Sequence, residues 1–447
     1  MQHRRHACLN LLFLSLSPAT WARAEFQTPP DGQQGPRPGP PPGPPREDRG
    51  RRDPRQRYSL QQAMSDKAQL HTIAFSGLAF LSGDFAADTF LPPGKIADYF
   101  GFQYLRDIDA AAGGHNPSFL TRIAFNMLTL MTPAQTAQLA ELAAAQEADL
   151  RRFALARLPL MRAFRRELDG QIPAGSSGLD HRAVVSHSAR LYELDGRLTL
   201  QRARVMARVA RSFGPEQLAR LEGLKFGDSR TWPDVPEPAA RRGLNHAQDV
   251  AVMTYASEMF AWVRGSLEAD TYFCPERHAM YFGGFGLKTA PAMGKKDYSI
   301  STALTGDAGA EFLALLNPGQ RAEIAELPER QRAWLNEIAS LRQQTSAALR
   351  QLLAGKEVDE GLVMHNSRRY GELDGELAWL YAQAFIRVGR SLTPAQKRAL
   401  AEMRARSPHG PNDPKGPFLF SSPLDAEGAA HAERVDALFG LPGTPAK

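Results

Sequence analysis

The feature that most constrains this chain is a four-residue phrase that occurs four times, each time opening a helix-forming run. The phrase is a capping residue or Gly, then Pro, any residue and Gln, and its copies begin at Thr132, Gly214, Asn317 and Thr393. A Thr or Asn side chain accepts from free backbone N–H groups, and Pro at the first helical position lacks a donor that would have no partner. Gln then falls at the third position, where its side chain can reach back to the cap. The phrase therefore predicts four helix N-termini.

The four phrases group into two pairs, because the chain contains a tandem duplication. Glu-Leu-Asp-Gly occurs at 193–196 and again 179 residues later at 372–375. Upstream, Tyr-Phe-Gly occurs at 99–101 and again 182 residues later at 281–283. Several independent markers agree on this register, which is typical of internal repeats. We therefore predict two homologous helical repeats.

The paired phrases resemble the LTXXQ motif of the Spy/CpxP-type periplasmic proteins, over roughly residues 131–224 and 317–403. Members of that family are small, all-helical, cradle-shaped dimers that act as ATP-independent chaperones or envelope-stress modulators. The resemblance implies an all-α fold and a chaperone-like activity toward unfolded or envelope proteins. Because family members pair two chains, the duplication predicts either a monomer with an internal pseudo-dimer or a homodimer.

Residues 1–24 have the three parts of a secretory signal peptide. Arg4 and Arg5 are basic, residues 7–16 are mostly apolar, and Ala22-Arg23-Ala24 offers a cleavage site. The apolar part is too short to cross a bilayer, which needs about 20 residues. We expect export to the periplasm, with no membrane span in the mature chain.

The remaining sequence divides by composition. Residues 25–57 are rich in Pro, Gly and Arg and predict a disordered tether. Leader and tether carry five of the six formal positive charges, so the nearly neutral remainder does not favour nucleic-acid binding. The expected organisation that follows is repeat 1 at 58–224, a linker at 225–243, repeat 2 at 244–406, and a Pro/Gly-rich tail at 407–447.

Helical periodicity predicts the same elements in each repeat. The expected helices are 60–81, 117–130, 133–168 and 181–213 in repeat 1, and 247–267, 308–316, 318–353 and 360–392 in repeat 2. Pro159 is expected to bend or break its helix. Gly196 and Gly375 lie at the same place inside the second long helix of each repeat, where Gly costs about 1 kcal/mol against Ala. Their recurrence predicts a close helix–helix contact.

Each repeat also contains a long segment dense in aromatic residues and Gly, at 89–116 and 271–307. Segments of this length are usually functional or disordered, and aromatic density argues against disorder. One interpretation is that the aromatic residues fill the core; we expect this of Phe100 and Phe282, packed on the first helix of their own repeat. The other is a client-binding surface, for which the candidate residues are Phe102, Tyr104 and Phe285.

Cys274, His278 and Met280 lie within seven residues and are soft ligands that suit copper. Their spacing matches no zinc template, and Cys274 is the only cysteine once Cys8 leaves with the signal, so no intrachain disulfide is possible. The sequence contains no nucleotide fingerprint or catalytic motif, and we expect neither an enzyme nor a cofactor. The favoured function is chaperone-like binding of unfolded or envelope polypeptides; the alternative is a copper-binding or redox sensor built on Cys274.

Overall fold

The structure, a computed structural model, describes residues 66–82, 118–224, 232–264, 267, 308–405 and 426–440. Within these ranges the chain is all-α, and the sole β feature is an isolated bridge between Leu179 and Phe439. No helix in the described ranges is long and apolar enough to cross a membrane. The helices are α4 (Asp66–Ser82), α6 (Ser118–Leu130), α7 (Pro133–Leu168), α8 (His181–Arg211), α9 (Pro215–Gly223), α10 (His246–Arg264), α13 (Ala308–Leu315), α14 (Pro318–Ala325), α15 (Leu327–Arg350), α16 (Glu360–Ser391), α17 (Pro394–Ala405) and α18 (Ala426–Ala432), with 3₁₀ turns η3 (Ala239–Arg241) and η4 (Asp436–Leu438).

The repeated phrase opens a helix at all four places, as predicted. The side chains of Thr132 and Asn317 accept from the backbone N–H groups of Gln135 and Gln320, at 3.3 and 2.9 Å. In return, the Gln side chain accepts from the backbone N–H of its cap, at 2.9 Å for Gln135 and 3.0 Å for Gln320. Gln217 and Gln396 accept from Gly214 and Thr393 in the same way, both at 2.9 Å.

The two repeats differ in how proline affects the long helix after the first phrase. α7 runs without a break from Pro133 through Pro159 to Leu168. The break occurs instead in repeat 2, where α14 ends at Ala325 and α15 begins at Leu327, with Pro328 in its first turn. Proline has no N–H to donate and its ring crowds the carbonyl four residues earlier, so a helix commonly restarts there.

α8 and α16 form the central pair of the fold and run antiparallel. Their contacts pair rising residue numbers on α8 with falling numbers on α16: Ser188 donates to Asp374 at 3.0 Å, and Arg204 pairs with Glu360. The rings of Tyr192 and Tyr370 stack near the middle, with centroids 4.7 Å apart. The two repeats therefore pair with each other through these helices inside one chain.

Glycine allows the close approach of α8 and α16, as the recurrence of Gly196 and Gly375 predicted. A Cβ on Gly196 would lie 2.6 Å from Cβ of Ser367, and one on Gly375 would lie 2.7 Å from Cα of Val185 and 3.2 Å from Cβ of Ser188. Ser188 and Ser367 are separated by the same 179 residues as the two glycines. The crossing therefore has an approximate two-fold axis.

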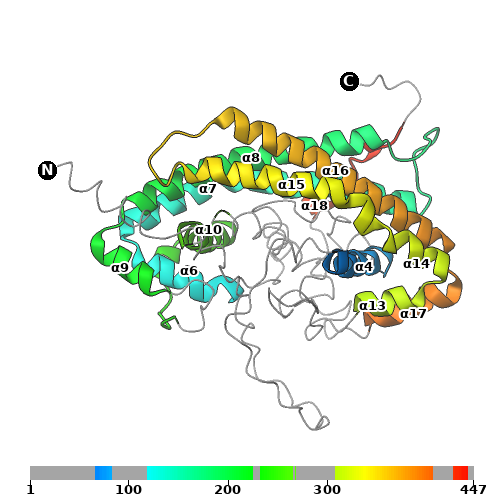
Figure 1. The fold of residues 1–447 in the computed structure, drawn as a ribbon, viewed down its shortest axis with the longest axis horizontal. Helices are drawn as coiled ribbons and strands as arrows, with labels where there is room; N and C mark the ends of the chain where they lie inside the picture. The colour runs from blue at the N-terminus through cyan, green and yellow to red at the C-terminus, as the bar shows by residue number, and fades with distance from the viewer. Residues whose placement is uncertain are drawn as a thin grey trace, which may run out of the picture.

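Figure 1 shows that α7, α8, α15 and α16 form an arch over the shorter helices. One end of the arch covers α6, α9 and α10, and the other end covers α4, α13, α14 and α17. Two large apolar cores follow this division, one containing α10 and the other containing α4.

The first helix of each repeat packs against the other repeat. α4, from repeat 1, contacts α13, α14, α15, α16 and α17 of repeat 2. α10, from repeat 2, contacts α6, α7 and α8 of repeat 1. The two repeats thus exchange their first helices, and the arch holds both.

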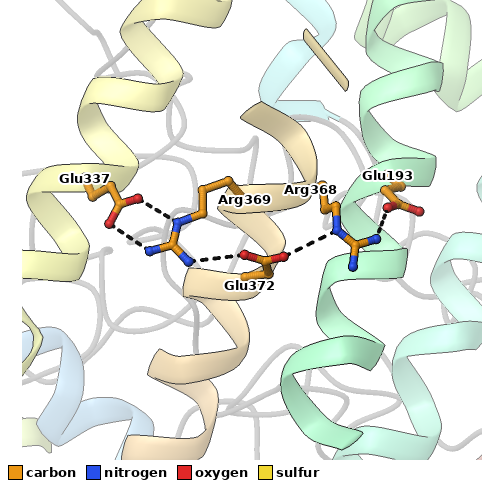
Figure 2. A network of polar contacts seen from close by, with 5 residues as sticks. All are labelled: Glu193, Glu337, Arg368, Arg369 and Glu372. Atoms are coloured by element: carbon orange, nitrogen blue, oxygen red, sulfur yellow. Dashed lines mark hydrogen bonds and ion pairs between the residues drawn. The ribbon is translucent and has the colours of Figure 1, made fainter. Parts of the chain in front are cut away.

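Polar contacts on the arch join helices that are distant in sequence. Figure 2 shows a chain of five side chains that crosses from α15 over α16 to α8: Glu337, Arg369, Glu372, Arg368 and Glu193. Arg369 binds Glu337 at 2.7 Å, and that hydrogen bond raises the pKa of Arg369. Because these groups are largely exposed, each pair contributes only about 0–1 kcal/mol, and the network mainly fixes the order of the three helices.

The C-terminal segment closes one side of the arch. Glu433 pairs with Arg162 on α7 at 3.1 Å, and the backbone N–H of Asp180 donates to Leu438 at 2.8 Å. Val435 and Phe439 are buried in the core that contains α4. The last part of the Pro/Gly-rich tail is therefore packed against α7 and the start of α8.

Candidate functional site

The first Gln pair locks the end of the arch that holds α10. Because α7 and α8 form an antiparallel hairpin, the start of α7 meets the end of α8, which brings two phrases together. The side-chain amide of Gln135 donates to the hydroxyl of Ser212 at 2.8 Å, and that of Gln217 donates to the carbonyl of Leu130 at 2.9 Å. The two glutamines also bond to each other at 2.7 Å.

The second Gln pair repeats this arrangement at the other end of the arch. Gln320 donates to Ser391, Gln396 donates to the carbonyl of Leu315, both at 3.0 Å, and Gln396 donates to Gln320 at 2.8 Å. All of these amide groups are used in joining helix ends. The repeated phrase is therefore a structural lock, which makes the surfaces beneath the arch the candidate functional site.

We call the faces of α6, α7 and α8 that pack against α10 the α10-binding surface. Ten consecutive residues of α10, 251–260, are buried, so the helix is enclosed on every side. Tyr255 donates to Gln146 at 2.8 Å, and Gln146 donates to the carbonyl of Leu198 at 3.0 Å. Hydrogen bonds therefore connect α10 through α7 to α8.

A buried ion pair joins α10 to α8. Arg202 is 0% exposed, pairs with Glu258 at 3.4 Å, and places its guanidinium carbon 4.5 Å from the ring centroid of Tyr255. A guanidinium over an aromatic face gains cation–π energy that grows when water is excluded. The α10-binding surface thus requires an acidic partner at one place on the helix that it holds.

We call the faces of α13, α14, α15, α16 and α17 that pack against α4 the α4-binding surface. Its centre is aromatic: Phe312 and Phe385 are both 0% exposed. A Cβ on Gly77 of α4 would lie 3.0 Å from a ring carbon of each, which is closer than ordinary contact. The surface therefore accepts glycine at this position because the two rings fill the space of a larger side chain.

The polar contacts of the α4-binding surface are neutral. Tyr381 donates to Gln331, and Gln331 donates to the side-chain oxygen of Gln69 on α4 at 3.1 Å. Burial raises the pKa of Tyr381, so its hydroxyl stays protonated and acts as the donor. Gln331 corresponds to Gln146, whereas Tyr381 stands where the other half has Arg202.

The described surface is poor in exposed apolar groups. Among the described residues, Ile172 and Leu362 are the large hydrophobic side chains that are exposed, at 38% and 37%. Such isolated residues are normal on soluble proteins and do not form a patch. Within the described ranges, the extended apolar surfaces are therefore those that α4 and α10 cover.

The residues that the sequence proposed for binding lie outside the described ranges. This applies to the client-contact candidates Phe102, Tyr104 and Phe285, to the core candidates Phe100 and Phe282, and to Cys274, His278 and Met280. Residues 1–24 and the tether at 25–57 also lie outside. Within the described ranges, no group of three or more His, Cys, Asp or Glu side chains is arranged to hold a metal ion.

Sequence reasoning missed the buried Arg202–Glu258 pair and the packing of Gly77 against two rings. A signal for the first was present, because Leu194, Leu198 and Arg202 follow each other at four-residue spacing. That spacing places a charge on the apolar stripe of α8. The partner, 56 residues away on a different helix, had no local signal.

Searches of protein-family models, of curated proteins and of solved structures found no match to this chain.

Proposed function

We propose that this chain is an ATP-independent, chaperone-like protein of the periplasm that binds unfolded or envelope polypeptides. The observation that carries the proposal is the seating of α4 on the α4-binding surface. There, a helix from one repeat is held by five helices of the other through aromatic packing and neutral hydrogen bonds. Recognition of an apolar helix by a complementary surface is a common mode of peptide binding.

The chemistry of the two parts of the arch suits this role. The surfaces beneath the arch are apolar, which favours association with apolar segments in proportion to the area buried. The outside of the arch carries mixed charges such as Arg368, Arg369 and Glu337, which favour solubility of a complex. Binding without catalysis needs nothing more than these two properties.

Suppression of client aggregation tests the proposal. The chain from residue 25 onward is mixed with reduced α-lactalbumin, and light scattering is followed with and without ATP. We expect scattering to fall at near-equimolar ratios, with no effect of ATP. Unchanged aggregation at a tenfold excess of the protein would contradict the proposal.

The proposed location and assembly have separate tests. Fractionation of cells, with the mass of the mature N-terminus, tests export and cleavage after Ala24. Light scattering of the purified protein tests the assembly, for which we propose a monomer because α8 and α16 already pair the two repeats. An obligate oligomer would contradict that part.

A further inference from the structure

The two exchanged helices differ in the chemistry that a replacement would need. On the α10-binding surface, Arg202 is buried against Glu258. A foreign helix without an acid at that place would bury an unpaired guanidinium, which is strongly unfavourable. The α10-binding surface is therefore selective for α10 itself.

α10 is also fixed from the chain segment that precedes it. Trp232 packs edge-on against Phe260, with ring centroids 4.4 Å apart. Arg241 makes a two-pronged ion pair with Asp249 at 2.6 Å. These contacts hold α10 at both its first turn and its buried middle.

α4 is held by chemistry that other helices share. Its Asp66 pairs with Arg332 at 2.9 Å in an exposed position, where ion pairs contribute little. Gln69 accepts from Gln331, an uncharged group that also receives a hydrogen bond from Tyr381 within its own surface. Charges are absent from the described contacts at the buried centre, so an apolar helix can replace α4 without leaving a buried ion.

The fit at Gly77 defines which helices can replace α4. Phe312, Phe385 and Gly77 occupy positions that correspond to Met127, Met206 and Met259 in the other half, and all of these residues are buried. Large rings and a glycine thus replace three side chains of intermediate size. A helix on the α4-binding surface needs a small residue opposite the rings and a hydrogen-bond acceptor eight residues earlier.

From this comparison we propose that α4 is a releasable internal occupant of the α4-binding surface. The partner that replaces it is an apolar helical segment of a client polypeptide, with Gly at the position of Gly77 and an acceptor at that of Gln69. This inference rests on the proposed function, and it assigns client binding to one of the two surfaces. α4 then competes with clients and keeps the surface covered in their absence.

A reciprocal pair of Gly→Leu substitutions tests the proposal. The probe is a fluorescein-labelled synthetic peptide with the sequence of residues 66–82, and its binding to the full mature chain is followed by anisotropy. The variant Gly77→Leu disturbs α4 but leaves the surface intact, so we expect it to bind the peptide at least about tenfold more tightly, because a covered surface lowers apparent affinity. A peptide that carries Leu at the Gly77 position should lose binding to both proteins.

Met259→Leu in α10 is the matched control, and we expect the peptide affinity of wild type. Equal peptide affinity of folded Gly77→Leu and wild type would overturn the proposal, as would equal binding of the Gly and Leu peptides. Hydrogen exchange on the wild-type chain provides a test that needs no variant. We expect amides of α4 to exchange at least about tenfold faster than those of α10, and equal protection would overturn the proposal.

The two proposals fail in different experiments. Tight peptide binding by Gly77→Leu without any suppression of client aggregation by the wild-type chain would remove the chaperone function and leave the releasable helix. Suppression of aggregation together with an α4 as protected as α10 would leave the function and place client binding elsewhere.

Discussion

α10 and α4 align in sequence and lie beneath opposite ends of the arch, but Arg202 and Glu258 in one half correspond to Tyr381 and Ser76 in the other. Both charges are present in the α10 half, and neither is present at the corresponding places in the α4 half. This is expected if each charge is tolerated in the core only with its partner. The difference separates two uses of one architecture: a buried ion pair specifies a single helix, and a neutral aromatic surface accepts a class of helices.

The largest expected effect comes from breaking the buried ion pair. Glu258→Ala leaves Arg202 in the core without this partner and should lower the free energy of unfolding by about 3–5 kcal/mol. Ser76→Ala, at the corresponding position of α4, should change it by less than about 1 kcal/mol, because no charge is left behind. Urea unfolding followed by circular dichroism measures both.

A double variant sharpens this comparison. Arg202→Tyr with Glu258→Ser gives the α10 half the residues of the α4 half, and it should be more stable than Glu258→Ala alone. A Glu258→Ala variant within about 1 kcal/mol of wild type would show that the ion pair does not distinguish the two halves.

A smaller effect is expected at the glycines of the α8–α16 crossing. Gly375→Ala directs a methyl group at the backbone of Val185, so the helices must separate, and we expect a loss of about 1–3 kcal/mol. Gly196→Ala meets the side chain of Ser367 instead, so adding Ser367→Gly should restore most of its stability. Thermal and urea unfolding give the comparison.

Gly223→Ala is the control, since nothing lies within 4 Å of a Cβ at that position and alanine favours the helix by up to about 1 kcal/mol. Failure of Ser367→Gly to rescue Gly196→Ala would show that the approach of the helices is limited by another contact.

The Gln locks are expected to contribute equally to the two halves. Gln135→Ala and Gln320→Ala each remove a cap acceptor and a donor to a helix end, and each should cost about 1–3 kcal/mol. Because the two hydrogen-bond networks match, the costs should agree within about 0.5 kcal/mol. Denaturant unfolding measures both, and a clear inequality would mean that the ends of the arch are not equivalent.

Much of the secondary structure could be predicted because its signals are local. The cap, Pro and Gln of each phrase act within four residues, and they gave the starts of α7, α9, α14 and α17. Helical periodicity gave the long helices to within a few residues at most ends. Proline was less informative, because Pro159 and Pro328 have the same local chemistry and only the second accompanies a break.

The exchange of α4 and α10 could not be predicted, because a helix that is apolar around most of its circumference does not indicate which surface it packs against. The Gln pairs also required three-dimensional information, since the glutamines meet only when α7 and α8 fold back on each other. Gly196 and Gly375 were an exception: their helical setting predicted close contact, and the duplication indicated that the contact occurs twice.

The smallest expected effect is a pH dependence that belongs to one half. His187, on α8, donates from Nε2 to the carbonyl of Ala156 at 2.6 Å, and loss of hydration in this partly buried position lowers its pKa. The corresponding residue of α16 is Asn366, which makes neutral hydrogen bonds and does not titrate. When the pKa is lower in the folded state, the unfolded chain binds more protons below about pH 6.5.

Stability from His187 is therefore complete above that pH and falls as the pH decreases toward the folded pKa, by at most about 1.4 kcal/mol per pH unit. His187→Asn gives the α10 half the residue of the other half, and it should flatten the curve between pH 6.5 and 5 while changing stability little at pH 8. Urea unfolding at constant ionic strength across this range measures the difference between the two proteins. Parallel curves for variant and wild type would show that His187 has the same proton affinity in the folded and unfolded chain.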